Sequence, residues 1–99
     1  MNKKEVKAIL EKEITTLANI SRDYHRDVLK DRMRCSDEGK DVHQDDDYQT
    51  HSRLQRTFED QAFEVVNIMQ ELGIITQEQR EARWHVLWNN CHAYDEVIG

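Results

Sequence analysis

Apolar residues recur at helical spacing through two long stretches of the chain, residues 2–36 and 42–72. Steps of three and four positions place side chains on one face of a helix. Proline is absent and glycine is rare, so little in either stretch would interrupt a helix. We therefore predict helices at about 3–35 and 43–72. The first apolar stripe is Val6, Leu10, Ile14, Leu17, Ile20, Tyr24 and Val28, and the second is Tyr48, His51, Leu54, Phe58, Ala62, Val65, Met69 and Leu72.

The predicted helix ends carry recognisable capping residues. Gly39 and Gly73 follow the two stretches and can adopt the left-handed conformation that ends a helix. Thr76 and Gln79 have the spacing of a capping box, in which each side chain bonds the other residue's backbone N–H. The box predicts a third helix at about 77–95. This helix carries an apolar set, and we expect the two tryptophans of the set to pack in the core. That set is Trp84, Leu87, Trp88, Cys91, Tyr94 and Ile98.

The lengths of these elements determine how they pack. Two helices of about 30 residues, or about 45 Å each, must run antiparallel when a short turn joins them. Folding about Gly39 pairs residues whose numbers sum to about 79, such as Leu17 with Ala62 and Val28 with His51. The third helix starts at the open end and covers only the lower half. We predict one all-α domain, residues 1–99: a long antiparallel helical hairpin with a third, shorter helix packed on its open end. Its base comprises 1–20 and 58–99, and its arm comprises 21–57.

Acidic residues are concentrated in the predicted turn, where residues 37–47 read DEGKDVHQDDD. The six acids are Asp37, Glu38, Asp41, Asp45, Asp46 and Asp47. With one lysine among them, they account for most of the formal net charge of −6. The helix dipole favours the last three at a helix start but disfavours the first three near a helix end. Two interpretations remain open: a contact surface for a basic partner, and a solvated loop followed by a favourable helix start.

The same region contains weak candidates for metal ligation. An EF-hand loop does not fit, because glycine occupies the third position and Tyr48 the twelfth. His43, Asp47 and His51 are suitable zinc ligands spaced one helical turn apart. The two histidines would lie about 12 Å apart along a helix, so one ion cannot bind all three. A His51–Asp47 pair is the simpler interpretation, and we predict no cofactor.

Other chemical signatures are lacking. Cys35 and Cys91 are too few for a disulfide framework, and Cys91 lies on an apolar stripe, as a buried structural thiol would. No Gly-rich phosphate loop is present. Since no catalytic motif is apparent, we expect no enzymatic activity. The chain has neither an apolar run of about 20 residues nor a signal-peptide pattern, so we expect a cytoplasmic protein.

Charge narrows the class of partner. An acidic chain lacks the basic face that binds nucleic acids or anionic membranes. DNA mimicry is disfavoured too, because arginines 22, 26, 32, 34, 53 and 56 line the arm. The preferred hypothesis is a small acidic interaction protein, an inhibitor or adaptor that docks on a basic protein surface through the turn. In size, charge and helix content the chain resembles the small acidic helical inhibitors of phages and mobile elements. The alternatives are a homodimer that buries the arm seam in a four-helix arrangement, and a His/Asp metal-dependent enzyme.

Overall fold

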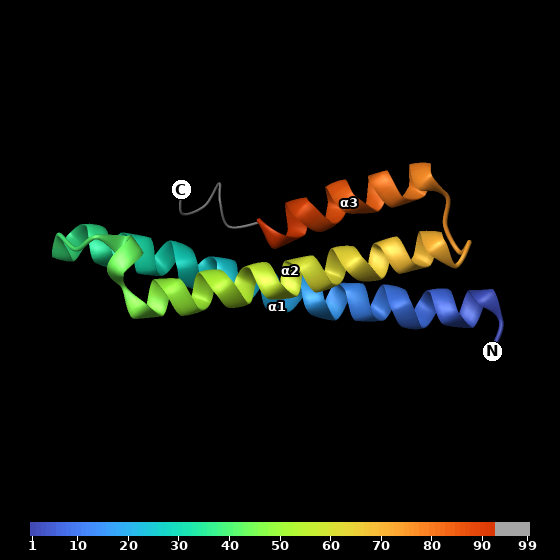
Figure 1. Ribbon diagram of the computed structural model, residues 1–99, viewed down its shortest axis with the longest axis horizontal. Coiled ribbons are helices and arrows are strands. Elements are labelled where there is room, and N and C mark those ends of the chain that lie inside the picture. The colour runs from blue at the N-terminus through green and yellow to red at the C-terminus, as the bar shows by residue number, and fades with distance from the viewer. Residues whose placement is uncertain (93–99) are drawn as a thin grey trace.

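The computed structural model describes residues 1–92, which form three α-helices and one 3-10 turn without any strand. The elements are α1 (Lys3–Glu38), η1 (Val42–Gln44), α2 (Asp46–Glu71) and α3 (Gln77–Cys91). Helices α1 and α2 form a long antiparallel hairpin, and α3 lies along the half nearest the N-terminus (Figure 1). The principal extents are 55 × 22 × 17 Å, the shape of a short rod. The predicted all-α hairpin with a third helix on its open end is confirmed.

The three predicted caps are present. Gly39 (φ 69°) and Gly73 (φ 71°) are both left-handed, and each donates its N–H to a carbonyl in the last turn of the preceding helix. Thr76 Oγ1 accepts the Gln79 N–H at 3.1 Å, while the Gln79 side chain accepts the Thr76 N–H at 2.9 Å. The chain therefore reverses direction where its capping residues indicate.

Two helix boundaries differ from the prediction. Helix α1 continues to Glu38, because the Gly39 cap lies directly after it. Helix α2 begins at Asp46, not near residue 43, because Asp45 accepts the Tyr48 N–H and caps the helix there. The expected end of α3 near residue 95, with Tyr94 and Ile98, falls outside the described residues.

The predicted register of the hairpin agrees with the contacts between α1 and α2. Ser21 Oγ donates to the Gln55 carbonyl at 3.0 Å. Farther along, Asp31 bonds His51 and Arg34 bonds Asp45, each at 2.6 Å. The residue numbers in these pairs add to values close to 79, as folding about Gly39 requires.

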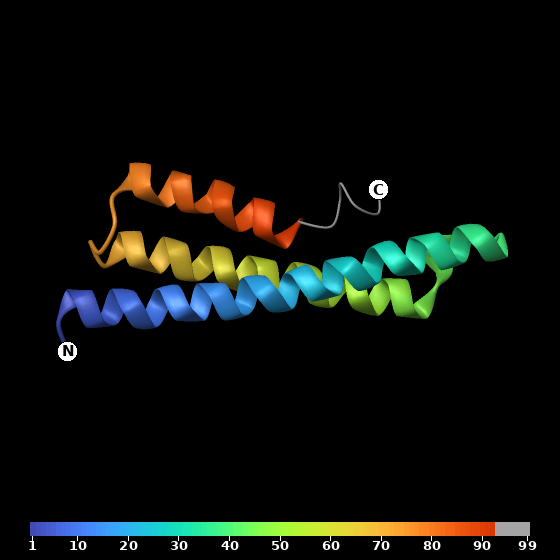
Figure 2. The same ribbon diagram turned by 180° about the vertical axis from the view of Figure 1, so that it is seen from behind.

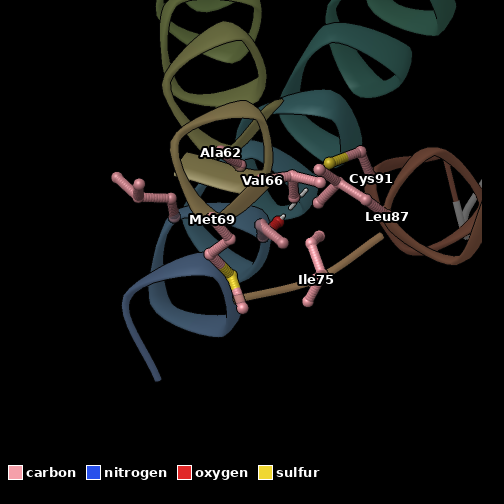
Figure 3. Packing of buried hydrophobic residues seen from close by; sticks show 8 residues of the cluster. Ala62, Val66, Met69, Ile75, Leu87 and Cys91 are labelled. Atoms are coloured by element: carbon pink, nitrogen blue, oxygen red, sulfur yellow. Dashed lines mark hydrogen bonds between the residues drawn. The ribbon is translucent and has the colours of Figure 1, made fainter. Parts of the chain in front are cut away.

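The apolar core lies in the base, where all three helices meet. Figure 3 shows Ala62, Val66 and Met69 of α2 facing Leu87 and Cys91 of α3. The core is completed from α1 and the α2–α3 loop by Leu17, Ala18 and Ile75. Both cysteines are buried and free, and burial raises the pKa of each thiol, which favours the protonated form. The expectation of a buried Cys91 is confirmed.

The prediction that the tryptophans pack in the core was wrong. Trp84 and Trp88 are 36% and 51% exposed and lie on the flank of α3. Trp84 meets the edge of Phe63 at 5.5 Å between ring centroids, and the Arg80 guanidinium lies 4.7 Å from its ring. The buried face of α3 runs through Leu87 and Cys91, which pack in the core with Val66 of α2, and so both indoles lie at the edge of that face.

The second stripe was also misjudged at its end. Val66 is fully buried although it lies beside the predicted position 65. Leu72 is 54% exposed, because it occupies the helix C-terminus where Gly73 turns the chain toward α3. The buried face of α2 is therefore rotated slightly from the one that the pattern indicated.

We expect these two neighbouring apolar residues to respond differently to truncation. Met69→Ala should lower the free energy of unfolding by about 2–5 kcal/mol, because it leaves a cavity among the three helices. Leu72→Ala, the matched surface control, should change it by less than about 0.5 kcal/mol. Urea unfolding followed by circular dichroism measures both, and equal losses would show that the core is wrongly assigned.

Candidate functional site at the hairpin tip

The strongest charge cluster lies at the end of the hairpin farthest from the N-terminus (Figure 2). We call residues 37–47 the acidic tip. Its backbone is ordered by hydrogen bonds from Lys40 N to Cys35 O (2.8 Å) and from Asp45 N to Val42 O (3.1 Å). The Asp41 carboxylate accepts the His43 N–H at 3.0 Å and so caps η1. The tip is therefore a folded turn with a defined backbone path.

Arg34, near the end of α1, lies at the centre of the ion pairs that hold the tip. Its Nη2 lies 2.6 Å from Asp45 Oδ2 and 3.6 Å from Asp31 Oδ1, while Nη1 is 3.7 Å from Glu38 Oε2. The hydrogen bond from Arg34, reinforced by the Tyr48 backbone N–H, holds the pKa of Asp45 below its usual value. The same hydrogen bond raises the pKa of Arg34 above its ordinary value. One guanidinium thus joins the end of α1 to the cap of α2.

The six predicted contact residues divide into two groups. Asp45 is held by Arg34, and Glu38 lies 2.9 Å from Lys40, whose hydrogen bond lowers the pKa of Glu38. The other four acids are exposed, and within residues 1–92 none of them lies within ion-pair distance of a cation. These four carboxylates, which we call the free acids, are Asp37, Asp41, Asp46 and Asp47.

The predicted pairing of His51 with Asp47 was wrong. His51 Nδ1 lies 2.6 Å from Asp31 Oδ2 on the opposite helix, and Asp31 is only 8% exposed. The hydrogen bond to Asp31 raises the pKa of His51 despite its partial burial. His51 faces α1 across the seam, whereas Asp47 lies on the exposed surface of α2. The histidine therefore closes the polar seam between the two helices.

The three candidate metal ligands do not share one helix face. His43 belongs to η1, outside α2, and contacts the edge of the Tyr48 ring at 5.7 Å. Among the described residues, one group of carboxylates, Asp31, Asp45 and Asp47, brings its oxygens within 4.8 Å of one another. Arg34 already pairs with the first two. The cluster is thus organised around a guanidinium, and its geometry favours an ion-pair network over metal coordination.

A second polar cluster lies where α3 ends against the hairpin. The rings of His25 and His92 meet edge to face at 4.7 Å, and His92 Nε2 lies 3.1 Å from Glu59 Oε1. Cys91 is fully buried beside them, with Sγ 4.0 Å from the Ala18 carbonyl. A thiol with a raised pKa is a poor nucleophile, so this cluster supports packing of α3.

No family model matches the chain, and no curated protein or solved structure is significantly similar to it. None of the helices within residues 1–92 has the length and apolar character needed to cross a membrane. Function is therefore inferred from the geometry and charge of the acidic tip.

The His51–Asp31 pair should make stability depend on pH. Because the folded pKa of His51 is raised, the pair contributes fully below the unfolded pKa of about 6.5 and loses its contribution as pH rises through the higher folded pKa. The free energy of unfolding should therefore be larger near pH 6 than near pH 8.5, and His51→Gln should reduce this difference.

Urea unfolding at both pH values, with the exposed His85→Gln as the control, measures the effect. An unchanged pH dependence in His51→Gln would contradict it.

Proposed function

We propose that this protein is an interaction module, an inhibitor or adaptor that docks on a basic surface of another protein through its acidic tip. The observation that carries the proposal is the division of charge at the tip. The nearby cations Arg34 and Lys40 are paired with Asp45 and Glu38, while the four free acids are exposed and have no cation within ion-pair distance among residues 1–92. The paired groups shape the turn, and the free acids remain for contact with a partner.

Order at the tip favours binding. The exposed Asp41 caps η1, and Asp46 and Asp47 lie in the first turn of α2, so a folded backbone fixes all three. A surface that is already ordered loses little conformational entropy on association. The free acids would therefore act as a positioned set of charges, which a flexible acidic loop would not.

The shape of the molecule places this set where a partner can reach it. Helix α3 covers only the base, so the arm beyond it is a two-helix projection that ends at the acidic tip (Figure 1). Complementary charges on a projecting element accelerate association, and salt weakens the effect. Fast, salt-sensitive docking on a basic surface is the behaviour that this geometry supports.

The two alternative functions receive less support. The homodimer alternative requires an uncovered arm seam, but Val28, Leu29 and Cys35 of that seam are already buried within one chain. A metal-dependent enzyme would need ligands that converge on an open position. In the tip, Arg34 holds two of the three clustered carboxylates.

A tip variant tests the proposal. This variant replaces each of the four free acids by asparagine: Asp37→Asn, Asp41→Asn, Asp46→Asn and Asp47→Asn. The amide introduced at position 41 keeps an oxygen that can cap η1. The matched control removes four exposed acids from the base through Glu13→Gln, Glu64→Gln, Glu71→Gln and Glu81→Gln. The partner is first captured from the native host with the unmodified protein and identified by mass spectrometry.

Association of each variant with that partner is then measured over a range of ionic strengths. At low salt the tip variant should associate roughly several tens-fold more slowly than the unmodified protein, and its association rate should depend less on ionic strength. The control should stay close to the unmodified protein. If the association rate fell equally in both variants, the net charge of the protein would explain the effect. If it did not fall in the tip variant, the tip would not be the docking surface.

A further inference from the structure

A depression of about 520 Å³ lies on α2 beside the acidic tip. Its lining includes Arg53 and Arg56 together with Gln49, Ser52 and Asp60 of the same helix. Gln49 Nε2 donates to the His43 carbonyl at 2.7 Å, which holds η1 against α2 and makes His43 one wall. The two arginines are three residues apart, so their side chains project from the same face of the helix.

These two arginines differ from the others in the described part of the chain. Arg22, Arg26, Arg34 and Arg83 each lie beside a carboxylate. Arg32 bonds the Tyr48 hydroxyl at 3.4 Å, and Arg80 lies over the Trp84 ring. For Arg53 and Arg56, residues 1–92 provide no carboxylate within ion-pair distance, no ring contact and no side-chain hydrogen bond, and both are exposed.

We propose that Arg53 and Arg56 bind a carboxylate side chain of the protein on which the acidic tip docks, an inference that rests on the proposed function. A guanidinium offers N–H groups in a planar fork that matches a carboxylate. The Ser52 hydroxyl lines the same depression and adds a neutral donor. The site is thus suited to one acidic side chain, held between two guanidinium groups.

The surrounding charge selects a singly charged ligand. Asp60 lines the depression. Asp46 lies seven residues before Arg53 along α2, a distance of about 10 Å. A nucleic acid or a phosphate dianion would be repelled by these carboxylates more strongly than a single carboxylate would. The chemistry therefore favours an acidic side chain of a protein partner.

Two sites of opposite sign would define how the partner docks. Its surface would carry a basic patch opposite the free acids and an acidic residue about 10 Å from that patch, opposite the arginine pair. Reversed docking would place like charges together, and such contacts oppose binding. The arginine pair would thus fix the direction in which the arm lies on its partner.

The binding site can be tested on the protein alone. The probe is acetyl-Gly-Glu-Gly-amide, which carries one carboxylate, and the readout is the Nε–Hε resonance of each arginine by NMR. Arg53 and Arg56 should shift saturably, with a millimolar dissociation constant, whereas the carboxylate-paired Arg22 and Arg26 should not. Equal shifts in all four arginines, or the same shifts in sodium chloride of equal ionic strength, would overturn the site. Tighter binding of inorganic phosphate than of the peptide would overturn the carboxylate assignment.

The captured partner provides the second test. Arg53→Gln with Arg56→Gln makes the arm more negative, so a purely electrostatic effect would strengthen binding to a basic surface. The proposed carboxylate contact predicts the opposite, a loss of affinity of about tenfold or more. The control, Lys30→Gln with Arg32→Gln, changes the charge of the arm equally through exposed residues of α1.

Unchanged or stronger binding by the Arg53→Gln/Arg56→Gln protein would overturn the inference. If the tip variant still lost affinity, the proposed function would stand without the arginine contact. If the tip variant bound normally, the proposed function itself would fail. The two failures are therefore distinguishable.

Discussion

The ion pair between Arg34 and Asp45 links the two helices at the end of the molecule that carries most of its charge. Asp45 also caps α2, so one carboxylate fixes both the start of that helix and its attachment to α1. Without Arg34, the acids of residues 37–47 would face one another with Lys40 as the single cation in the turn. Such a turn would favour expanded conformations in which like charges separate. The folded shape of the tip therefore depends on this contact.

The hairpin has different interactions at its two ends. In the base, apolar burial beneath α3 supplies most of the stability. In the arm, the buried Ser21 and Asp31 and the half-buried His51 form hydrogen bonds that cross between the helices. A slip in register would leave Asp31 buried without its partner, and an unpaired buried charge is costly. We infer that the polar pairs contribute chiefly to register, while the core holds the helices together.

Much of this fold could be predicted because its signals are local or periodic. Gly39 and Gly73 mark left-handed turns, and folding about Gly39 is enough to place α1 beside α2. The tryptophans were misplaced because their spacing put them on the same apolar stripe as Leu87 and Cys91. Val66 was missed because Val65, the apolar residue beside it, was assigned to the stripe instead. Neither error changes the topology, since each concerns only the rotation of a helix about its axis.

The site was harder to predict, because the ion pairs that shape it depend on three-dimensional proximity. Six arginines line the arm, and nothing in their spacing distinguishes Arg34, which orders the tip, from Arg53 and Arg56, which have no partner in the described residues. The choice of Asp31 over Asp47 as the partner of His51 likewise depends on which helix face turns inward. Hydrophobic periodicity does not detect polar residues that are buried in pairs.

Amide hydrogen exchange of the unmodified protein and of Arg34→Gln tests the central claim, that Arg34 orders the acidic tip. The Lys40, Asp45 and Tyr48 amides are hydrogen-bonded within the tip, and Met69 lies in the core of the base. An Arg34-dependent tip predicts that the first three amides are protected in the unmodified protein and lose that protection in Arg34→Gln, while Met69 retains its own. Unchanged protection of the tip amides in Arg34→Gln would contradict the claim.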